Sequence, residues 1–177
     1  MPASARVPRT HRIMAFVIAP CVVAAGLIAG MTTAASAHAT VLLNGKDAKA
    51  GKRGVVTMRI PHGCNGTLAT NKVKTRFGKK WKAKPKAVQG WSSQKRRTKQ
   101  GRTVIVWRAV GQPLGAKEVQ DFKLRVRYPK KAGIYSTPTI QVCGDVKSKW
   151  TAPDRGGADG HHAYPVDYPV PRIKVGA

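Results

Sequence analysis

Two stretches of this chain alternate apolar or β-branched residues with cations at a period of two. In "DFKLRVRYP" (residues 121–129), Phe, Leu and Val are each followed by Lys or Arg, and "NKVKTRF" (residues 71–77) repeats the pattern. Successive side chains of a strand point to opposite faces, so this pattern predicts half-buried strands whose cations face water. Helical periodicity is absent after residue 37, and the alternation therefore favours an all-β fold.

Other strand candidates are short and are separated by Gly, Pro, Asn and Asp. About seven such strands in one chain segment of ordinary domain size predict a single domain over residues 38–177. The layout that fits this spacing is an antiparallel β-sandwich of immunoglobulin-like type. The additional candidates are Thr40–Leu43, Gly54–Ile60, Thr103–Ala109, Ile134–Val142 and Pro169–Val175.

The segment before this domain has the pattern of an export signal. Three arginines and no acid occur in the first twelve residues, and an apolar run from Ile13 to about Met31 follows. The run ends at Ala35-Ser36-Ala37, small residues of the kind that signal peptidase requires. We predict that residues 1–37 are a signal peptide cleaved before His38, which makes the mature protein secreted or extracytoplasmic, within the cell envelope. The alternative is a retained anchor, because the run approaches the about 17–25 residues of a membrane span.

No stretch after residue 37 is apolar enough to cross a bilayer, so we expect no transmembrane helix in the mature chain. Export also determines the cysteine count, because Cys21 leaves with the signal and Cys64 and Cys143 remain. An even pair in an oxidising compartment predicts a disulfide. The alternative is that one or both thiolates are soft ligands for Cu(I).

The charge is extreme. The formal net charge is +26, and removal of the three arginines of the signal leaves +23. Such a field attracts polyanions, and "QKRRTKQGR" (residues 94–102) has the composition of a loop that grips them without specificity. Aromatic residues for base stacking are scarce among the cations, so no specific nucleic acid is expected. The candidate contacts to an anionic envelope polymer are Lys95, Arg96, Arg97 and Lys99.

His38 is the first candidate metal ligand. If cleavage makes it the first residue, its amine and its Nδ1 form a chelate ring on one ion, and these borderline bases suit Cu(II). A strand that begins directly after it would hold the terminus rigid. The second candidate is His62 in "IPHGCNG", where the alternative is an exposed turn residue beside a structural cysteine. His161 and His162 lie in a Gly-rich segment and are expected in a surface loop.

A catalytic interpretation finds little support. The chain has seven acidic residues, among which Glu118 is the single glutamate. Glu118 and Asp121 do not form a recognisable dyad, and the sequence contains no nucleophile elbow, phosphate-binding loop or Cys-x-x-Cys pair. We therefore predict that the protein is not an enzyme.

Several segments together resemble one known family. "AHATVLLN", "VTMRIPHGCNGTLATNKVKTRF", "PKAVQGW", "DFKLRVRYP", "YSTPTIQVCGDVKSKW" and "GADGHHAYPVDYPVPRIKV" are similar, in order, to the YcnI-like copper-binding domain family. The resemblance covers residues 38–175. It implies an immunoglobulin-like β-sandwich that binds Cu(II) through a brace made by one N-terminal histidine, completed by a carboxylate, with a tryptophan nearby.

Residue by residue, the resemblance places the brace on His38 and the tryptophan on Trp150. The turn that would carry the carboxylate reads Pro61-His62-Gly63-Cys64, so His62 is the natural replacement ligand. The chain departs from the family in its strong positive charge and in lacking the common C-terminal membrane helix. The resemblance implies copper trafficking or buffering, with copper-handling envelope proteins as partners. The alternatives are a basic polyanion-binding surface protein with a weak or lost metal site, and a copper monooxygenase.

Overall fold

The computed structural model describes residues 38–153 and 169–177. Within these ranges the regular structure is entirely β, and no helix there is long and apolar enough to cross a membrane. All described strands belong to one compact unit, Ala34–Ala177. The strands are β1 (Thr40–Leu42), β2 (Arg53–Ile60), β3 (Lys72–Phe77), β4 (Lys82–Pro85), β5 (Trp91–Arg97), β6 (Thr103–Ala109), β7 (Gln120–Arg127), β8 (Gly133–Ser136), β9 (Thr139–Cys143), β10 (Val146–Trp150) and β11 (Arg172–Val175).

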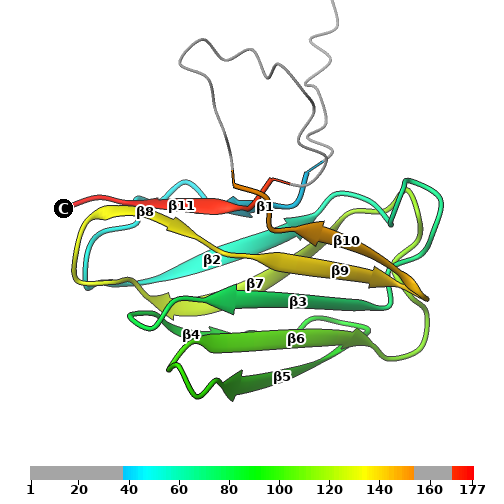
Figure 1. Cartoon of the computed structure of the whole chain (residues 1–177), viewed down its shortest axis with the longest axis horizontal. Helices are drawn as coiled ribbons and strands as arrows, with labels where there is room; N and C mark the ends of the chain where they lie inside the picture. The colour runs from blue at the N-terminus through cyan, green and yellow to red at the C-terminus, as the bar shows by residue number, and fades with distance from the viewer. Residues whose placement is uncertain (1–37, 154–168) are drawn as a thin grey trace, which may run out of the picture. The chain divides into compact units, whose positions relative to one another are not determined.

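The strands form two main sheets that face each other across the core (Figure 1). One sheet has the order β1-β2-β7-β4, and the other has the order β10-β9-β3-β6-β5. A small sheet pairs β11 with β8, and every strand pairing is antiparallel. The predicted immunoglobulin-like antiparallel sandwich is confirmed.

The core contains two aromatic clusters. In one, Trp81 packs against Phe77 and Tyr128, with ring centroids 5.5 and 5.7 Å apart. In the other, Phe122 of β7 contacts Trp107 of β6, and both centroid distances from Phe122, to Trp107 and to Trp91, are 4.9 Å. The inward positions predicted from the alternation are therefore filled by large rings from both sheets. All buried core residues lie between Ala39 and Val175, so a chain that begins at His38 contains the whole described core.

The segment Ile134–Val142, expected as one strand, is divided between two sheets. Residues on its N-terminal side join β8, and those after Pro138 join β9. The buried Thr137 fixes the division, because its N–H and its hydroxyl both donate to the Pro171 carbonyl, at 2.8 and 3.0 Å. Pro138 follows and has no N–H to continue the ladder, so the chain changes sheet here.

The expectation of a loop over residues 94–102 is wrong for its first half. Gln94–Arg97 lies in β5, which pairs with β6 along its whole length, and Thr98–Gly101 forms the hairpin turn. The cationic composition suggested a loop because cations disfavour burial. A strand at the edge of a sheet tolerates them, since both of its faces here are exposed.

Candidate functional site

His38 lies at the entry to the sandwich. It is exposed, and the chain behind it is anchored at once by the buried Ala39 and by β1, whose first residue pairs with Arg59 of β2. The His38 ring stands edge-on to the Trp150 ring, with centroids 5.9 Å apart and planes at 89°. The residue expected to begin the mature protein is thus in contact with the expected tryptophan.

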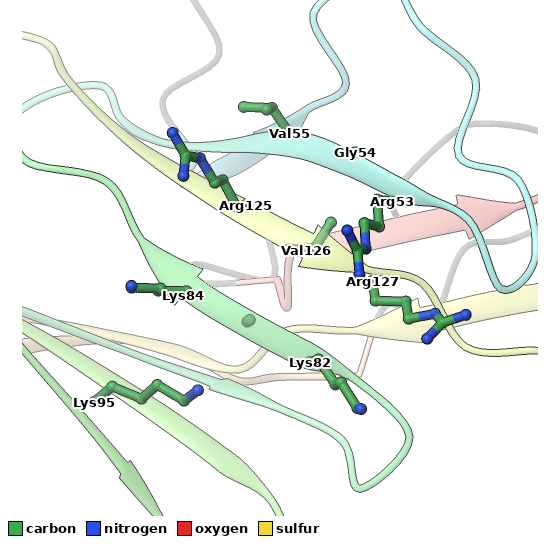
Figure 2. Close-up of a pocket in the computed structure, with 10 residues that line it drawn as sticks. Arg53, Gly54, Val55, Lys82, Lys84, Lys95, Arg125, Val126 and Arg127 are labelled. Carbon is green, nitrogen blue, oxygen red and sulfur yellow. The ribbon is translucent and has the colours of Figure 1, made fainter.

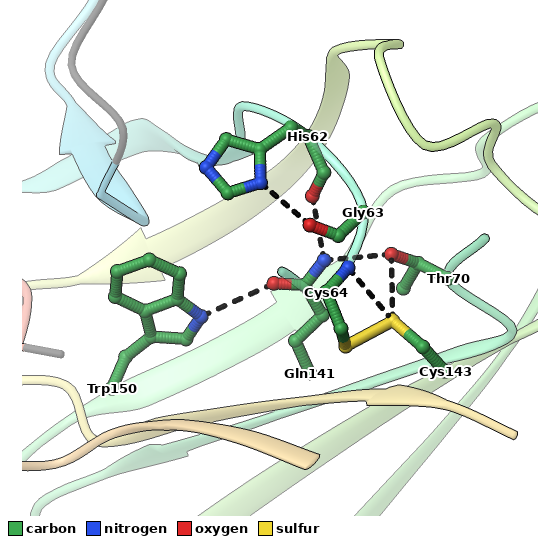
Figure 3. Close-up of a disulfide and its surroundings, with 7 residues drawn as sticks. All are labelled: His62, Gly63, Cys64, Thr70, Gln141, Cys143 and Trp150. Carbon is green, nitrogen blue, oxygen red and sulfur yellow. Dashed lines mark hydrogen bonds between the residues drawn. A yellow bond between two sulfur atoms is a disulfide. The ribbon is translucent and has the colours of Figure 1, made fainter. Parts of the chain in front are cut away.

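Trp150 is held by a buried glutamine. It is the last residue of β10, is 1% exposed, and its indole N–H donates to Oε1 of Gln141 at 3.3 Å. The amide nitrogen of Gln141 donates to the His62 carbonyl at 2.6 Å and to the Thr70 hydroxyl at 2.7 Å (Figure 3). Gln141 therefore ties the tryptophan to the turn that carries His62.

The turn after β2 has the compact geometry that its sequence predicts. Asn65 and Gly66 both have positive φ, 52° and 68°, which Asn and Gly tolerate best. Gly63 is buried, and a Cβ there would lie 1.9 Å from the Leu68 carbonyl oxygen, so only glycine fits. The Nδ1 atom of His62 contacts the Gly63 carbonyl oxygen, with the other ring nitrogen on the far side of the ring (Figure 3).

Cys64 and Cys143 form a disulfide, which confirms the predicted pairing. It joins the His62 turn to the end of β9 across 79 positions of sequence, and the Cys64 N–H donates to Sγ of Cys143 at 3.1 Å. The alternative of thiolate ligands for Cu(I) is wrong for this state, because both sulfurs are used in the bond. Disulfides of this kind persist in oxidising compartments, which agrees with an extracytoplasmic location.

We call His38, His62, Gln141 and Trp150 the histidine end. A chain of contacts runs through it, from the His38 ring to Trp150, then to Gln141, then to the His62 carbonyl. Within the described ranges no group of three or more His, Cys, Asp or Glu side chains is placed to hold a metal. Metal binding here would depend on the amine and ring of His38 together with His62. Residues 1–37, and His161 and His162, lie outside the described residues.

The four cations predicted to contact a polyanion do not form one patch. Lys95, Arg96 and Arg97 alternate along β5, and Lys99 is in the hairpin turn. Arg96 lines a depression of about 180 Å³ with Lys74 and Arg76. Lys95 instead lines a larger groove of about 530 Å³ with cations of the other sheet. The physical reason is the strand pleat, which sends successive side chains to opposite faces.

We call this larger cavity the basic groove (Figure 2). Its floor includes Gly54 and Val55 of β2, and no acidic residue is among the described residues that line it. The cations of the basic groove are Arg53, Lys82, Lys84, Lys95, Arg125 and Arg127.

On the same sheet, but outside the groove, Arg59 and Asp121 form a two-pronged ion pair at 2.8 Å. The hydrogen bond to Asp121 and the charge of Asp121 raise the pKa of Arg59.

Sequence reasoning missed Gln141 and Thr70 at the histidine end, and Lys84 in the groove. Gln141 had a detectable signal, since the alternation of β9 puts it on the inward side with Thr139 and Cys143. A glutamine at an inward position indicates a buried polar network. Lys84 belongs to β4, whose four residues are too few for a periodic signal.

Solved structures define the fold class. An uncharacterised protein from Nocardia farcinica with an immunoglobulin-like fold superposes with a TM-score of 0.67 at 23% identity, covering 80% of this chain and 100% of that one. A cohesin module of a family 33 glycoside hydrolase from Clostridium perfringens superposes with a TM-score of 0.50 at 10% identity, covering 78% and 95%. At these identities the likeness shows the fold alone. The protein is thus an immunoglobulin-like sandwich with an exposed histidine at its entry.

The family follows from the sequence match. Residues 38–175 match the model described as "Domain of unknown function (DUF1775)", and the chain belongs to this family. The YcnI-like proteins that the sequence resembles are known by the same description. The match begins at His38, the residue predicted to follow the cleavage site. No curated protein matches the chain.

Proposed function

We propose that the protein binds Cu(II) at the histidine end, with His38 as the first residue of the mature chain. The observation that carries this proposal is the edge-on contact between the rings of His38 and Trp150, 5.9 Å apart. The histidine expected to be N-terminal stands beside the buried indole that the resemblance assigns to the metal site. The start of the family match at His38 supports the same processing site.

The donor set fits copper in its chemistry. Cleavage before His38 creates an amine beside its imidazole, and these borderline nitrogen bases favour Cu(II) within the divalent series. His62 would add a ring nitrogen, and its Nδ1 is already against the Gly63 carbonyl, so this role falls to Nε2. The turn has no carboxylate, so the bound ion keeps more of its positive charge. Trp150 excludes water from one side of His38.

We propose a carrier or buffer of copper, exported through cleavage of residues 1–37, and not an enzyme. The ion is cargo in this role, and the protein's own contribution is to fix the ligands. β1 holds the backbone next to His38, while the disulfide and Gln141 hold the His62 turn. A copper monooxygenase is the less favoured alternative, because the described surface has no flat aromatic platform beside His38. Oxidation of a polysaccharide in the presence of copper and a reductant would favour that alternative.

The decisive experiment compares two proteins that differ by one residue. One begins at His38, and the other carries an N-acetylated alanine ahead of it, which removes the free chelating amine and leaves every described residue unchanged. Cu(II) affinity is measured by calorimetry, and the ligand atoms by electron paramagnetic resonance. We expect the extra residue to weaken binding by more than the roughly 10–100-fold that loss of an outer-sphere partner produces.

His62→Ala in the protein that begins at His38 then tests the second ligand. It should weaken Cu(II) binding less than the added alanine does and should change the nitrogen hyperfine pattern. Equal binding by the two forms that differ at the N-terminus would contradict the brace. Absence of binding by either form would contradict the copper proposal itself.

A further inference from the structure

We propose that the basic groove binds a linear phosphate-bearing polymer that has a flexible backbone and no bases. The first observation is the convergence of charge. Three strands of one sheet and β5 of the other supply six cations around a cavity of about 530 Å³. In Figure 2 the side chains of Lys84 and Lys95 stand on β4 and β5, the end strands of the two sheets, with Arg125 beyond Lys84.

The second observation is the register of the strands. Arg127 of β7 lies directly opposite Arg53 on one side and Lys82 on the other, which places three cations in one row across the sheet. In the next row Arg125 lies opposite Lys84. Like charges at directly opposite positions destabilise a sheet, so these rows are unfavourable to the folded protein in the absence of a ligand.

The same sheet also contains a cation that lies directly opposite an acidic residue. Arg59 and Asp121 occupy directly opposite positions of β2 and β7 and form an ion pair at 2.8 Å. An acid opposite a cation is therefore compatible with these two strands. The rows of the groove keep cations at the corresponding positions, which is the arrangement expected where the counter-charge is supplied by a bound anion.

The lining indicates which polyanion fits. Binding of single-stranded nucleic acid relies on aromatic side chains that stack on bases, and no aromatic residue is among the described residues of the lining. The floor offers the aliphatic Val55, 37% exposed, and the backbone of Gly54. A bilayer surface is flat and would meet one sheet face, whereas Lys95 reaches the groove from the other sheet. A flexible chain of phosphodiesters can follow such a concave surface and contact cations on both sides.

The test uses the copper-free protein and a synthetic poly(glycerol phosphate), with binding followed by fluorescence anisotropy or calorimetry. Lys84→Gln with Arg125→Gln removes two cations of one row, neither of which has another role in the site. Lys147→Gln with Lys149→Gln is the matched control, because these cations are exposed on β10 and alternate in the same way. An oligothymidylate and vesicles rich in phosphatidylglycerol are the competing ligands.

We expect the native protein to bind poly(glycerol phosphate), and the Lys84/Arg125 variant to bind it about tenfold more weakly at physiological salt. The slope of log K against the logarithm of the salt concentration should become shallower by about 1.4, because two phosphate contacts are lost. The control pair should change affinity less than about twofold. Equal losses in both double variants, no binding by the native protein, or tighter groove-dependent binding of the oligothymidylate or vesicles would overturn the proposal. Copper binding by the same variants is unaffected in either case, which keeps this test separate from that of the histidine end.

Discussion

The histidine end and the basic groove use the surface of one sandwich in opposite ways. At the histidine end, the exposed His38 stands beside the buried Trp150, and the buried Gln141 is hydrogen-bonded to Trp150, to Thr70 and to the His62 turn. At the groove, cations remain outside and face other cations across the strands. The first region has a defined, hydrogen-bonded geometry, and the second has a high density of exposed positive charge.

The comparison implies different responses to substitution. Substitution of a buried residue that makes several hydrogen bonds removes all of those bonds at once. Changes to the buried residues of the histidine end should therefore lower the free energy of unfolding strongly. Exposed like charges repel, so removal of a groove cation should raise stability while it weakens binding.

Removal of the disulfide by Cys64→Ala with Cys143→Ala should have the largest effect. The bond closes a loop across 79 positions, and the chain-entropy model gives about 4.5 kcal/mol for a loop of this size. Urea denaturation at neutral pH measures the loss. Addition of a reductant should lower the stability of the native protein to that of the double variant and leave the variant unchanged. A double variant as stable as the native protein would show that the His62 turn is held without the bond.

Gln141→Met should destabilise the protein by about 2–3 kcal/mol, because the methionine fills the space but leaves buried partners without their amide. The groups that lose their hydrogen bond to Gln141 are the Trp150 N–H, the His62 carbonyl and the Thr70 hydroxyl. Gln94→Met is the control, since Gln94 is exposed on β5 and its loss should change stability by less than about 0.5 kcal/mol. Similar effects of the two substitutions would remove the distinction between a bonded interior and a tolerant surface.

Lys84→Gln with Arg125→Gln should increase the free energy of unfolding by about 0.5 kcal/mol, the scale of one cross-strand pair. The gain should shrink in about 1 M salt, where the screening length falls to about 3 Å. Thermal unfolding at low and high salt measures both effects, with Lys147→Gln and Lys149→Gln as the control. A loss of stability in the Lys84/Arg125 variant would show that the row is not repulsive.

The smallest effect concerns Tyr128, whose hydroxyl lies 2.5 Å from the position that a Cβ on Gly54 would occupy, beneath the groove floor. Burial raises the pKa of Tyr128 above its ordinary value of 10.0. The folded state therefore keeps this proton at a pH where the unfolded chain has lost it. The contribution of the buried Tyr128 phenol to the free energy of unfolding is fully present below about pH 10. It declines as the pH rises through the pKa of Tyr128 in the folded state.

Tyr128→Phe should abolish that decline. Urea midpoints of the native and variant proteins should differ by a constant amount up to about pH 9, and the native protein alone should lose this part of its stability above pH 10. A difference that stays constant to the highest pH would mean that the phenol is not protected by burial.

The alternation in the sequence was sufficient for much of the fold. It predicted β3 and β7, because each of these strands has an apolar face toward the core. The spacing of Gly, Pro, Asn and Asp predicted β2 and β6. Neither pattern predicted β5, whose two exposed faces give no hydrophobic period, or the change of sheet at Pro138. Both depend on pairing with distant strands, which a local pattern does not encode.

The candidate sites divide in the same way. His38 and His62 could be named from the cleavage pattern and the turn, and the tryptophan came from the family resemblance; copper binding by these residues stays a prediction. Gln141 was missed because its three bonds reach Trp150, Thr70 and the His62 turn, which are distant from one another in sequence. The groove was missed because its rows arise from register, and sequence alone does not reveal which cations stand opposite one another.

β5 also bears on how the protein behaves at high concentration. It is the last strand of its sheet, and seven consecutive residues present an edge to which another copy could add a strand. Lys95, Arg96 and Arg97 place cations on both faces of that edge, so two copies repel each other as they approach. Solubility should therefore depend on ionic strength: concentrated salt, or a polyanion below the amount needed to coat every molecule, should promote self-association through β5.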